Sequence, residues 1–234
     1  MNFLSKVGDF LTSGANWSGP DGFLTQLVTQ VEVSAIAIVA AALVGVALGT
    51  FLSHTRRGGF LAVNSANAAR AIPSFSLVVL IAIQPAIVRL QQGGFVATAI
   101  TMFALAVPPI LTNTYTGVRG VDDDVRSAAM GMGMTTAQLV RRVELPLALP
   151  LVVAGVRTAA VEVVATATLG AYVGVIDLGF DIFAGLDTNN GVETFAGAAL
   201  VAALALVVDL VFLVAAWAVT PRNIQRHGPI LRPV

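Results

Sequence analysis

The stretch from Val33 to Ser53 contains no Asp, Glu, Lys or Arg and is rich in Ala, Val, Leu and Ile. A helix of about 20 mostly apolar residues can cross the hydrocarbon core of a membrane. Over all 234 residues, 56% are hydrophobic and only 11% are charged, against about 25% charged residues in soluble domains. A soluble chain of this composition would leave large apolar patches in water. We therefore predict an all-α, polytopic membrane protein.

Four further apolar stretches bring the expected number of membrane spans to about five. The predicted spans cover 24–53, 71–88, 91–118, the segment from after Pro146 to about Val175, and 195–220. Residues 89–94 are predicted to form a tight turn between the second and third spans. Gly45 and Gly49 stand four residues apart in the first span, a spacing that permits close helix packing.

The basic residues predict the orientation, because cytoplasmic loops of membrane proteins are enriched in Lys and Arg. With the N-terminus outside, the inner loops and the C-terminal tail hold nine of the thirteen basic residues. These nine are Arg56, Arg57, Arg119, Arg126, Arg141, Arg142, Arg222, Arg226 and Arg232. We therefore predict a multi-pass protein of the bacterial cytoplasmic membrane, with its N-terminus outside and its C-terminus inside.

Three regions follow from this orientation. Residues 1–23 are predicted to be a retained outer segment at the membrane surface, in which 14–22, rich in Gly and Pro, breaks any helix. Residues 24–220 form the transmembrane domain, with an inner loop at about 117–146. Residues 221–234 form a cytoplasmic tail.

The composition also excludes several classes of function. Thirteen basic and thirteen acidic residues give zero net charge, which argues against a nucleic-acid partner. The one lysine, Lys6, precedes Val7, whereas an ATP-binding phosphate loop needs Gly-Lys-Ser/Thr. No cysteine is present, and His54 and His227 lack a ligand set, so we predict no metal site and expect both histidines to be solvated. No acid, base and nucleophile gather at one depth, so we predict no catalytic residues and no enzyme activity.

The longest inner loop carries the clearest local signals. Asp122–Asp124 suit the start of a helix, where acidic side chains meet the positive end of the helix dipole. Gly133 permits a sharp turn with positive φ, and Thr135 or Thr136 can cap the next helix. Pro146 then marks the start of the fourth span. The sequence predicts a short cytoplasmic helix with small side chains, which would let another protein approach its backbone closely.

This loop resembles the inner loop of ABC importer permeases of the binding-protein-dependent type, type I. Their pattern is Glu-Ala-Ala, three residues, Gly, nine residues and Ile-x-Leu-Pro. The same spacing joins Ser127, Ala128, Ala129, Gly133, Val143, Leu145 and Pro146, with Ser in place of Glu and Val in place of Ile. The resemblance implies that these residues couple the chain to an ATPase. A bulky charge at Ala129, or valine at Gly133, is then expected to leave insertion intact and uncouple transport.

Further segments resemble the glycine betaine/carnitine/choline permeases within this group. They are 67–74, 113–119, 131–134, 143–150 and 154–159, and the likeness extends over about 24–186. It implies a translocation subunit for osmoprotectants, without settling among glycine betaine, choline, carnitine and proline betaine. It also implies four partners: a cytoplasmic ABC ATPase dimer that holds ATP and Mg²⁺, a second permease subunit, an extracytoplasmic substrate-binding protein and the lipid bilayer. The second permease could be identical or homologous.

Charges inside the predicted spans allow two interpretations. Arg157 and Glu162 in the fourth span, and Asp209 in the fifth, could form ion pairs with other spans or subunits, or could line a path. Pro73 could break the second span beside a path or could make a packed kink. An ion-coupled secondary transporter would use these charges without ATP and is the alternative function. Such transporters generally contain an internal repeat, which this sequence lacks.

Overall fold

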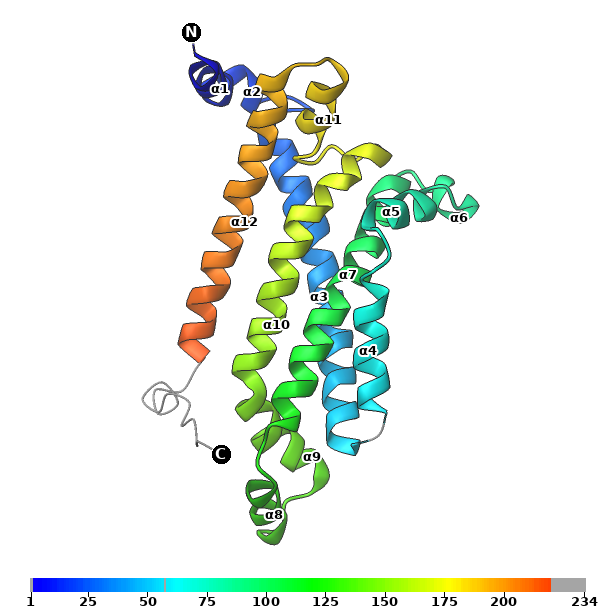
Figure 1. Ribbon diagram of the computed structural model, residues 1–234, viewed down its shortest axis with the longest axis vertical. Helices are drawn as coiled ribbons and strands as arrows, with labels where there is room; N and C mark the ends of the chain where they lie inside the picture. The colour runs from blue at the N-terminus through cyan, green and yellow to red at the C-terminus, as the bar shows by residue number, and fades with distance from the viewer. Residues whose placement is uncertain (1, 57, 220–234) are drawn as a thin grey trace.

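The computed structural model describes residues 2–56 and 58–219, and every regular element in them is helical (Figure 1). The helices are α1 (Phe3–Thr12), α2 (Gly14–Trp17), α3 (Phe23–Thr55), α4 (Gly59–Ala69), α5 (Ser74–Ala82), α6 (Pro85–Val88), α7 (Gly93–Arg119), α8 (Asp123–Gly131), α9 (Thr136–Leu139), α10 (Leu145–Thr166), α11 (Phe180–Asp187) and α12 (Gly191–Val219). A π-helical segment, Val140–Glu144, joins α9 to α10, and a 3₁₀ segment, Ala167–Val173, follows α10. The predicted cytoplasmic tail, with His227 and its arginines, lies outside the described residues, as does Arg57.

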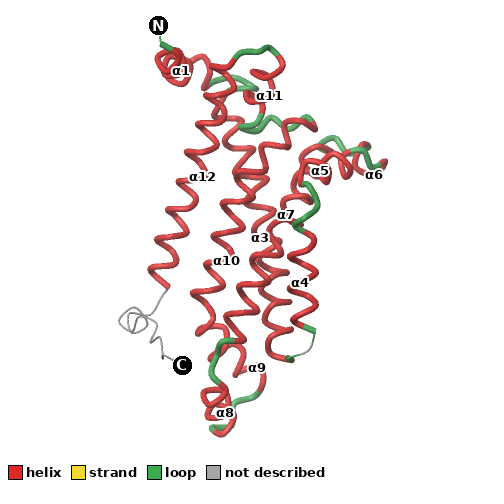
Figure 2. The backbone as a smooth tube through the Cα atoms, viewed as in Figure 1, coloured by secondary structure: helices red, strands yellow, loops and turns green. Residues whose placement is uncertain are grey.

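Four helical stretches are long and apolar enough to cross a membrane: Phe23–Thr55, Gly93–Arg119, Thr136–Val173 and Gly191–Ala218. Counted together as one broken span, α4 and α5, which are bent by 82° at their junction, bring the number of candidate spans to five. The chain passes repeatedly between two ends of the bundle, with α1 at one end and α8 at the other (Figure 2). The prediction of about five spans is therefore confirmed.

The bounds of the second span were predicted wrongly. The helical pair begins at Gly59, well before the predicted start at residue 71, and its bend lies at residues 70–73. Asn64 and Asn67 make α4 too polar to stand out as a membrane span in the sequence. Pro73 caps α5, and Pro85 starts the separate short helix α6, because proline lacks the N–H that would continue a helix.

The helix that contains the fourth span begins before Pro146, the residue at which we predicted the span to start. Its continuous helical stretch runs from Thr136 to Val173, so Pro146 lies inside it as the second residue of α10. The preceding segment, Val140–Glu144, is π-helical. A π-helical turn inside a longer helix is rare and frequently marks a functional site.

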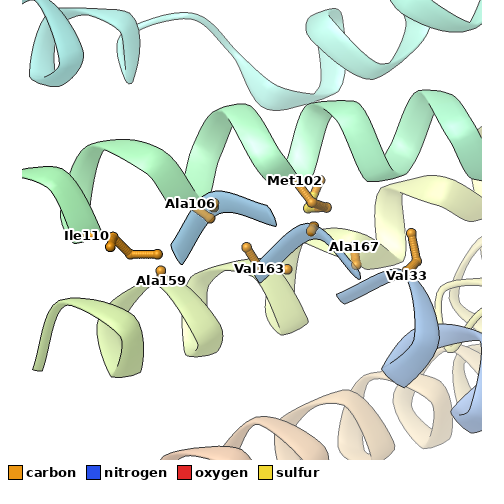
Figure 3. Packing of buried hydrophobic residues seen from close by; sticks show 9 residues of the cluster. Val33, Met102, Ala106, Ile110, Ala159, Val163 and Ala167 are labelled. Atoms are coloured by element: carbon orange, nitrogen blue, oxygen red, sulfur yellow. The ribbon is translucent and has the colours of Figure 1, made fainter. Parts of the chain in front are cut away.

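The core lies where α3, α7 and α10 meet, and small residues make close contact possible (Figure 3). Its buried members are Val33, Ala37, Ala41, Met102, Ala106, Ile110, Ala159, Val163 and Ala167. A Cβ atom added at Gly45 would lie 2.9 Å from Cγ2 of Ile110, and one at Gly49 would lie 2.8 Å from Cβ of Thr114. The prediction that these two glycines permit close packing is confirmed.

The N-terminal segment covers the predicted outer end of the bundle (Figure 1). In α1, Phe3 contacts Phe195 of α12 with ring centroids 5.6 Å apart, and Val7 is buried. The stretch 14–22 does not break all helical structure as predicted, because Gly14–Trp17 forms one turn. Trp17 packs edge-on against Phe23 at the start of α3.

Candidate coupling site and transport path

The inner loop adopts the local structure that its sequence predicts. Asp122 caps α8, its side chain accepting a hydrogen bond of 2.8 Å from the N–H of Asp124. Gly133 has a φ of 84°, and Thr135 forms a capping box with Gln138 at the start of α9. The loop is therefore a short helix, a glycine turn and a second, capped helix at the end of the bundle opposite α1 (Figure 2).

The residues of the coupling motif point in different directions. Ser127, Ala128 and Met130 are exposed on α8, and Met132, directly after the helix, is 74% exposed. Ala129 is buried at 3% exposure. Ala129 therefore faces inward, and Ala128 is the member of the pair that faces outward. Because a bulky charge at Ala129 would be buried, we expect it to disturb the packing of α8 in addition to the uncoupling that the sequence suggested. Farther along, Val143 and Leu145 are half-buried and Pro146 is exposed.

A buried ion pair fixes α8 to the start of the fourth span. Nε of Arg126 lies 3.1 Å from Oε1 of Glu144, which is only 1% exposed. Nη2 of Arg126 also donates a hydrogen bond of 2.5 Å to the carbonyl of Val118 at the end of α7. One guanidinium thus holds three segments together: α7, α8 and the π-helical segment.

Two residues at the end of α3 join the same cluster. Nδ1 of His54 lies 3.0 Å from Oε2 of Glu144, and Arg56 forms an ion pair with Asp123 of α8. His54 was predicted to be solvated, but it is half-buried against this carboxylate. We call Arg126, Glu144, His54, Arg56 and Asp123 the inner polar cluster.

The inner polar cluster was not predicted from the sequence. Glu144 occupies the unspecified position before Leu145-Pro146 in the motif, and Arg126 directly precedes Ser127. One feature of the sequence could have indicated this pair: a charged residue stands at each end of a short loop next to a membrane span. Unpaired charges near the membrane interior are costly, so two such residues are expected to pair.

The bend between α4 and α5 places two charges in one pocket. Nη2 of Arg70 lies 3.0 Å and 2.8 Å from the two carboxylate oxygens of Glu162 in α10. Both side chains line a pocket of about 380 Å³, together with Pro73 and Ser74 at the bend and Thr166 at the end of α10. The structure thus brings two predicted residues, Pro73 and Glu162, to one place and adds Arg70.

Arg157 and Asp209 lie apart from this pocket. Nε and Nη2 of Arg157 donate hydrogen bonds of 2.7 Å and 2.8 Å to the two oxygens of Asp209, which joins α10 to α12. Both intramembrane charges of α10 therefore form ion pairs, each with a different element, and Glu162 also lines the pocket at the bend.

The predicted outer end carries two buried carboxylates. Asp177 is fully buried, its Oδ1 accepting a hydrogen bond of 2.8 Å from the N–H of Gly179, and burial raises its pKa to about 7. Asp181 accepts a hydrogen bond of 2.7 Å from Nε2 of Gln26 in α3, and burial raises its pKa as well. Asp181 thus joins α11 to α3, whereas the hydrogen bond of Asp177 stays within the segment that leads into α11.

Comparisons with known proteins agree with this architecture. The family described as "Binding-protein-dependent transport system inner membrane component" matches residues 22–222. The choline transport system permease protein OpuBB of Bacillus subtilis is 37% identical over 84% of this chain and 88% of its own length. The glycine betaine/carnitine/choline transport system permease protein OpuCB of the same organism is 35% identical over 82% of this chain and 86% of its own length.

A solved structure has the same fold. A chain of the MetNI methionine ABC transporter, in an inward-facing conformation, superimposes with a TM-score of 0.74 and 22% identity. The match covers 85% of this chain and 96% of the MetNI chain.

Proposed function

Because the chain belongs to the family of binding-protein-dependent transport system inner membrane components, we propose that it forms the translocation path of an ATP-driven importer for osmoprotectants. The substrate class is the quaternary amines named for its relatives, which include choline, glycine betaine and carnitine. The chain is a multi-pass protein of the cytoplasmic membrane, and its family is one of translocation subunits rather than enzymes.

One observation carries the mechanism: Arg126 and Glu144 fasten an exposed helix to the start of a membrane span. The outward face of α8, with Ser127 and Ala128, would seat in the ATPase. Movement of that ATPase would displace α8, and the buried ion pair would pass the displacement to the long helical stretch Thr136–Val173. Coupling of this kind requires that ATP and solute each favour one of two states of the whole transporter.

The remaining parts of the machine belong to partners. ATP and Mg²⁺ would be held by a cytoplasmic ATPase dimer, since this sequence lacks a phosphate-binding loop. A second permease subunit would complete the path, and an extracytoplasmic binding protein would deliver the solute to the predicted outer end. There, α1 and α11 lie at the end of the bundle nearest to such a partner (Figure 1).

Reconstitution in liposomes tests the proposal. The chain is combined with its candidate ATPase and binding protein, and uptake of labelled glycine betaine and labelled choline is measured with and without ATP. We expect uptake only when all components and ATP are present. Uptake by this chain alone, driven by an ion gradient, would establish the secondary-transporter alternative instead. No ion pair in the described part of the chain favours that alternative, because Arg157 and Glu162 both have protein partners.

A further inference from the structure

The pocket at the bend of the second span combines features suited to a small zwitterion. It holds one guanidinium, Arg70, and one carboxylate, Glu162, and its volume of about 380 Å³ falls within the range of about 300–1,000 Å³ typical of ligand sites. The remaining lining is mostly apolar, with hydroxyl groups from Ser74 and Thr166. A few convergent polar groups in an apolar setting are the usual composition of a small-molecule site.

The position of the pocket is that of a transport path. It lies where α4 ends and α5 begins, at an 82° bend, and broken helices of this kind commonly border substrate sites in transporters. Asn64, Asn67 and Arg70 follow one another at three-residue intervals and are all exposed, so they lie along one side of α4. Polar side chains at membrane depth usually face a water-filled cavity or other protein, so we expect this side of α4 to face away from lipid.

The two ionic groups are accessible, in contrast to the buried Arg126–Glu144 pair. The side chain of Arg70 is 40% exposed and that of Glu162 is 24% exposed, whereas Glu144 is 1% exposed. Phe75 directly follows Ser74 of the pocket lining and contacts Tyr172 edge-on, with ring centroids 4.8 Å apart, although neither ring is itself part of the lining. Aromatic faces attract quaternary ammonium groups.

We propose that the Arg70–Glu162 pair is a transient binding site for the transported solute within the permease. A zwitterionic solute replaces the pair: its carboxylate binds Arg70 and its quaternary ammonium group lies beside Glu162. The two protein charges re-form their ion pair after the solute leaves. This inference rests on the proposed function, because it assigns a place on the path to the same substrates.

Comparing the binding of glycine betaine with the binding of choline distinguishes a solute-binding role of the Arg70–Glu162 pair from a purely structural role. Both carry a quaternary ammonium group, but only glycine betaine carries a carboxylate. We expect Arg70→Gln to weaken glycine betaine binding by about tenfold or more, since a hydrogen bond to a charged group is lost, and to leave choline binding unchanged or tighter. Glu162→Gln is expected to weaken binding of both solutes.

Binding is measured by scintillation proximity on the purified permease–ATPase complex without the binding protein, whose own selectivity then has no influence. Arg157→Gln is the matched control, because it breaks the other intramembrane ion pair of α10, which lies outside the pocket. We expect this variant to change the binding of glycine betaine and the binding of choline by the same factor per assembled complex. If Arg70→Gln fails to assemble, the doubly neutral variant Arg70→Gln with Glu162→Gln leaves no unpaired charge and must lose binding of both solutes.

The proposal is overturned if the wild-type complex binds neither solute, if the pocket variants bind both as the wild type does, or if Arg70→Gln reduces both by one common factor. These outcomes are distinct from failure of the proposed function. That function is judged by ATP-dependent uptake in the complete wild-type system. Such uptake can be observed even if the pocket variants bind both solutes as the wild type does.

Discussion

Arg126 of α8 and Glu144 of the π-helical segment form an ion pair of 3.1 Å at the end of the bundle that is predicted to face the cytoplasm. Glu144 also contacts His54, so its carboxylate has a cation or a hydrogen-bond donor against each oxygen. Removing one partner of a buried pair leaves an uncompensated charge, which costs more than the pair contributes. This pair is therefore where α8 and the fourth span are joined most firmly.

The first prediction concerns that pair. Arg126→Gln is expected to destabilise the protein by about 3–5 kcal/mol, because Glu144 is left buried without its cation. The measurement is the apparent melting temperature of the purified permease in detergent. Arg141→Gln, on an exposed residue at the same end, is expected to change it little. Equal melting temperatures for Arg126→Gln and the wild type would show that the pair does not hold α8 in place.

The second prediction separates the two alanines of the coupling motif. Ala128→Glu adds a charge on the exposed face of α8 and is expected to leave the melting temperature unchanged while weakening co-purification of the ATPase. Ala129→Glu buries a charge at a site that is 3% exposed and is expected to lower expression and stability. If Ala128→Glu retains the ATPase and full uptake, the outward face of α8 is not the docking surface.

The third prediction concerns the turn after α8. Gly133 has a positive φ, a conformation that costs residues with a Cβ atom about 1–2 kcal/mol. Gly133→Ala is therefore expected to shift the turn and reduce ATP-dependent uptake, and Gly133→Val to reduce it further. Gly131→Ala is the matched control, since Gly131 is helical and, like Gly133, has open space around a new Cβ atom. That control is expected to be neutral or to stabilise α8 slightly.

The fourth prediction is a pH dependence at the predicted outer end. Burial raises the pKa of Asp177 from its ordinary value of 3.8 to about 7, so between about pH 4 and 7 the folded protein holds a proton that the unfolded chain has lost. Stability then falls as the pH rises through this window, by at most about 1.4 kcal/mol per pH unit, and the loss is complete above about pH 7. Asp181, whose pKa is also raised by burial, contributes with the same sign.

Asp177→Asn tests this dependence, because it removes the charge while keeping the size of the side chain. It is expected to be more stable than the wild type at pH 8 and similar to it at pH 4, as measured by thermal unfolding across the pH range. Asp187→Asn, on an exposed residue of α11, is expected to keep the wild-type profile. A wild-type profile for Asp177→Asn would assign the pH dependence to other groups.

The sequence was sufficient wherever structure is set by neighbouring residues. Asp122 caps α8, Gly133 adopts a positive φ and Thr135 caps α9 as predicted, because caps and turns depend on a few consecutive residues. The long apolar spans were predicted for the same reason. The second span was misplaced because Asn64 and Asn67 lower the hydropathy of its first half. The groups that surround these two side chains come from other parts of the chain and cannot be predicted from the neighbouring residues.

The polar contacts of the candidate sites could not be predicted, because they join distant residues. His54 and Glu144 are 90 residues apart, and Arg70 and Glu162 are 92 apart. Arg157 and Glu162 stand five residues apart on one helix, yet each pairs with a different element. Which charge meets which depends on how the helices pack, and only the three-dimensional structure supplies that.

The last prediction tests whether Arg157 and Asp209 transport ions or hold two helices together. Each side chain is 33% exposed, and the pair is the ionic contact between α10 and α12 within the described residues. Asp209→Leu alone leaves an unpaired arginine at membrane depth, at a cost of about 2.5–3.5 kcal/mol, and is expected to reduce the yield of folded protein. Arg157→Met combined with Asp209→Leu removes both charges and is expected to restore the yield. Per folded transporter, ATP-dependent uptake by the double variant should equal that of the wild type, since a structural pair contributes to assembly and not to the transport cycle. A double variant that folds normally but imports nothing would show instead that these charges act in transport, as the ion-coupled alternative requires.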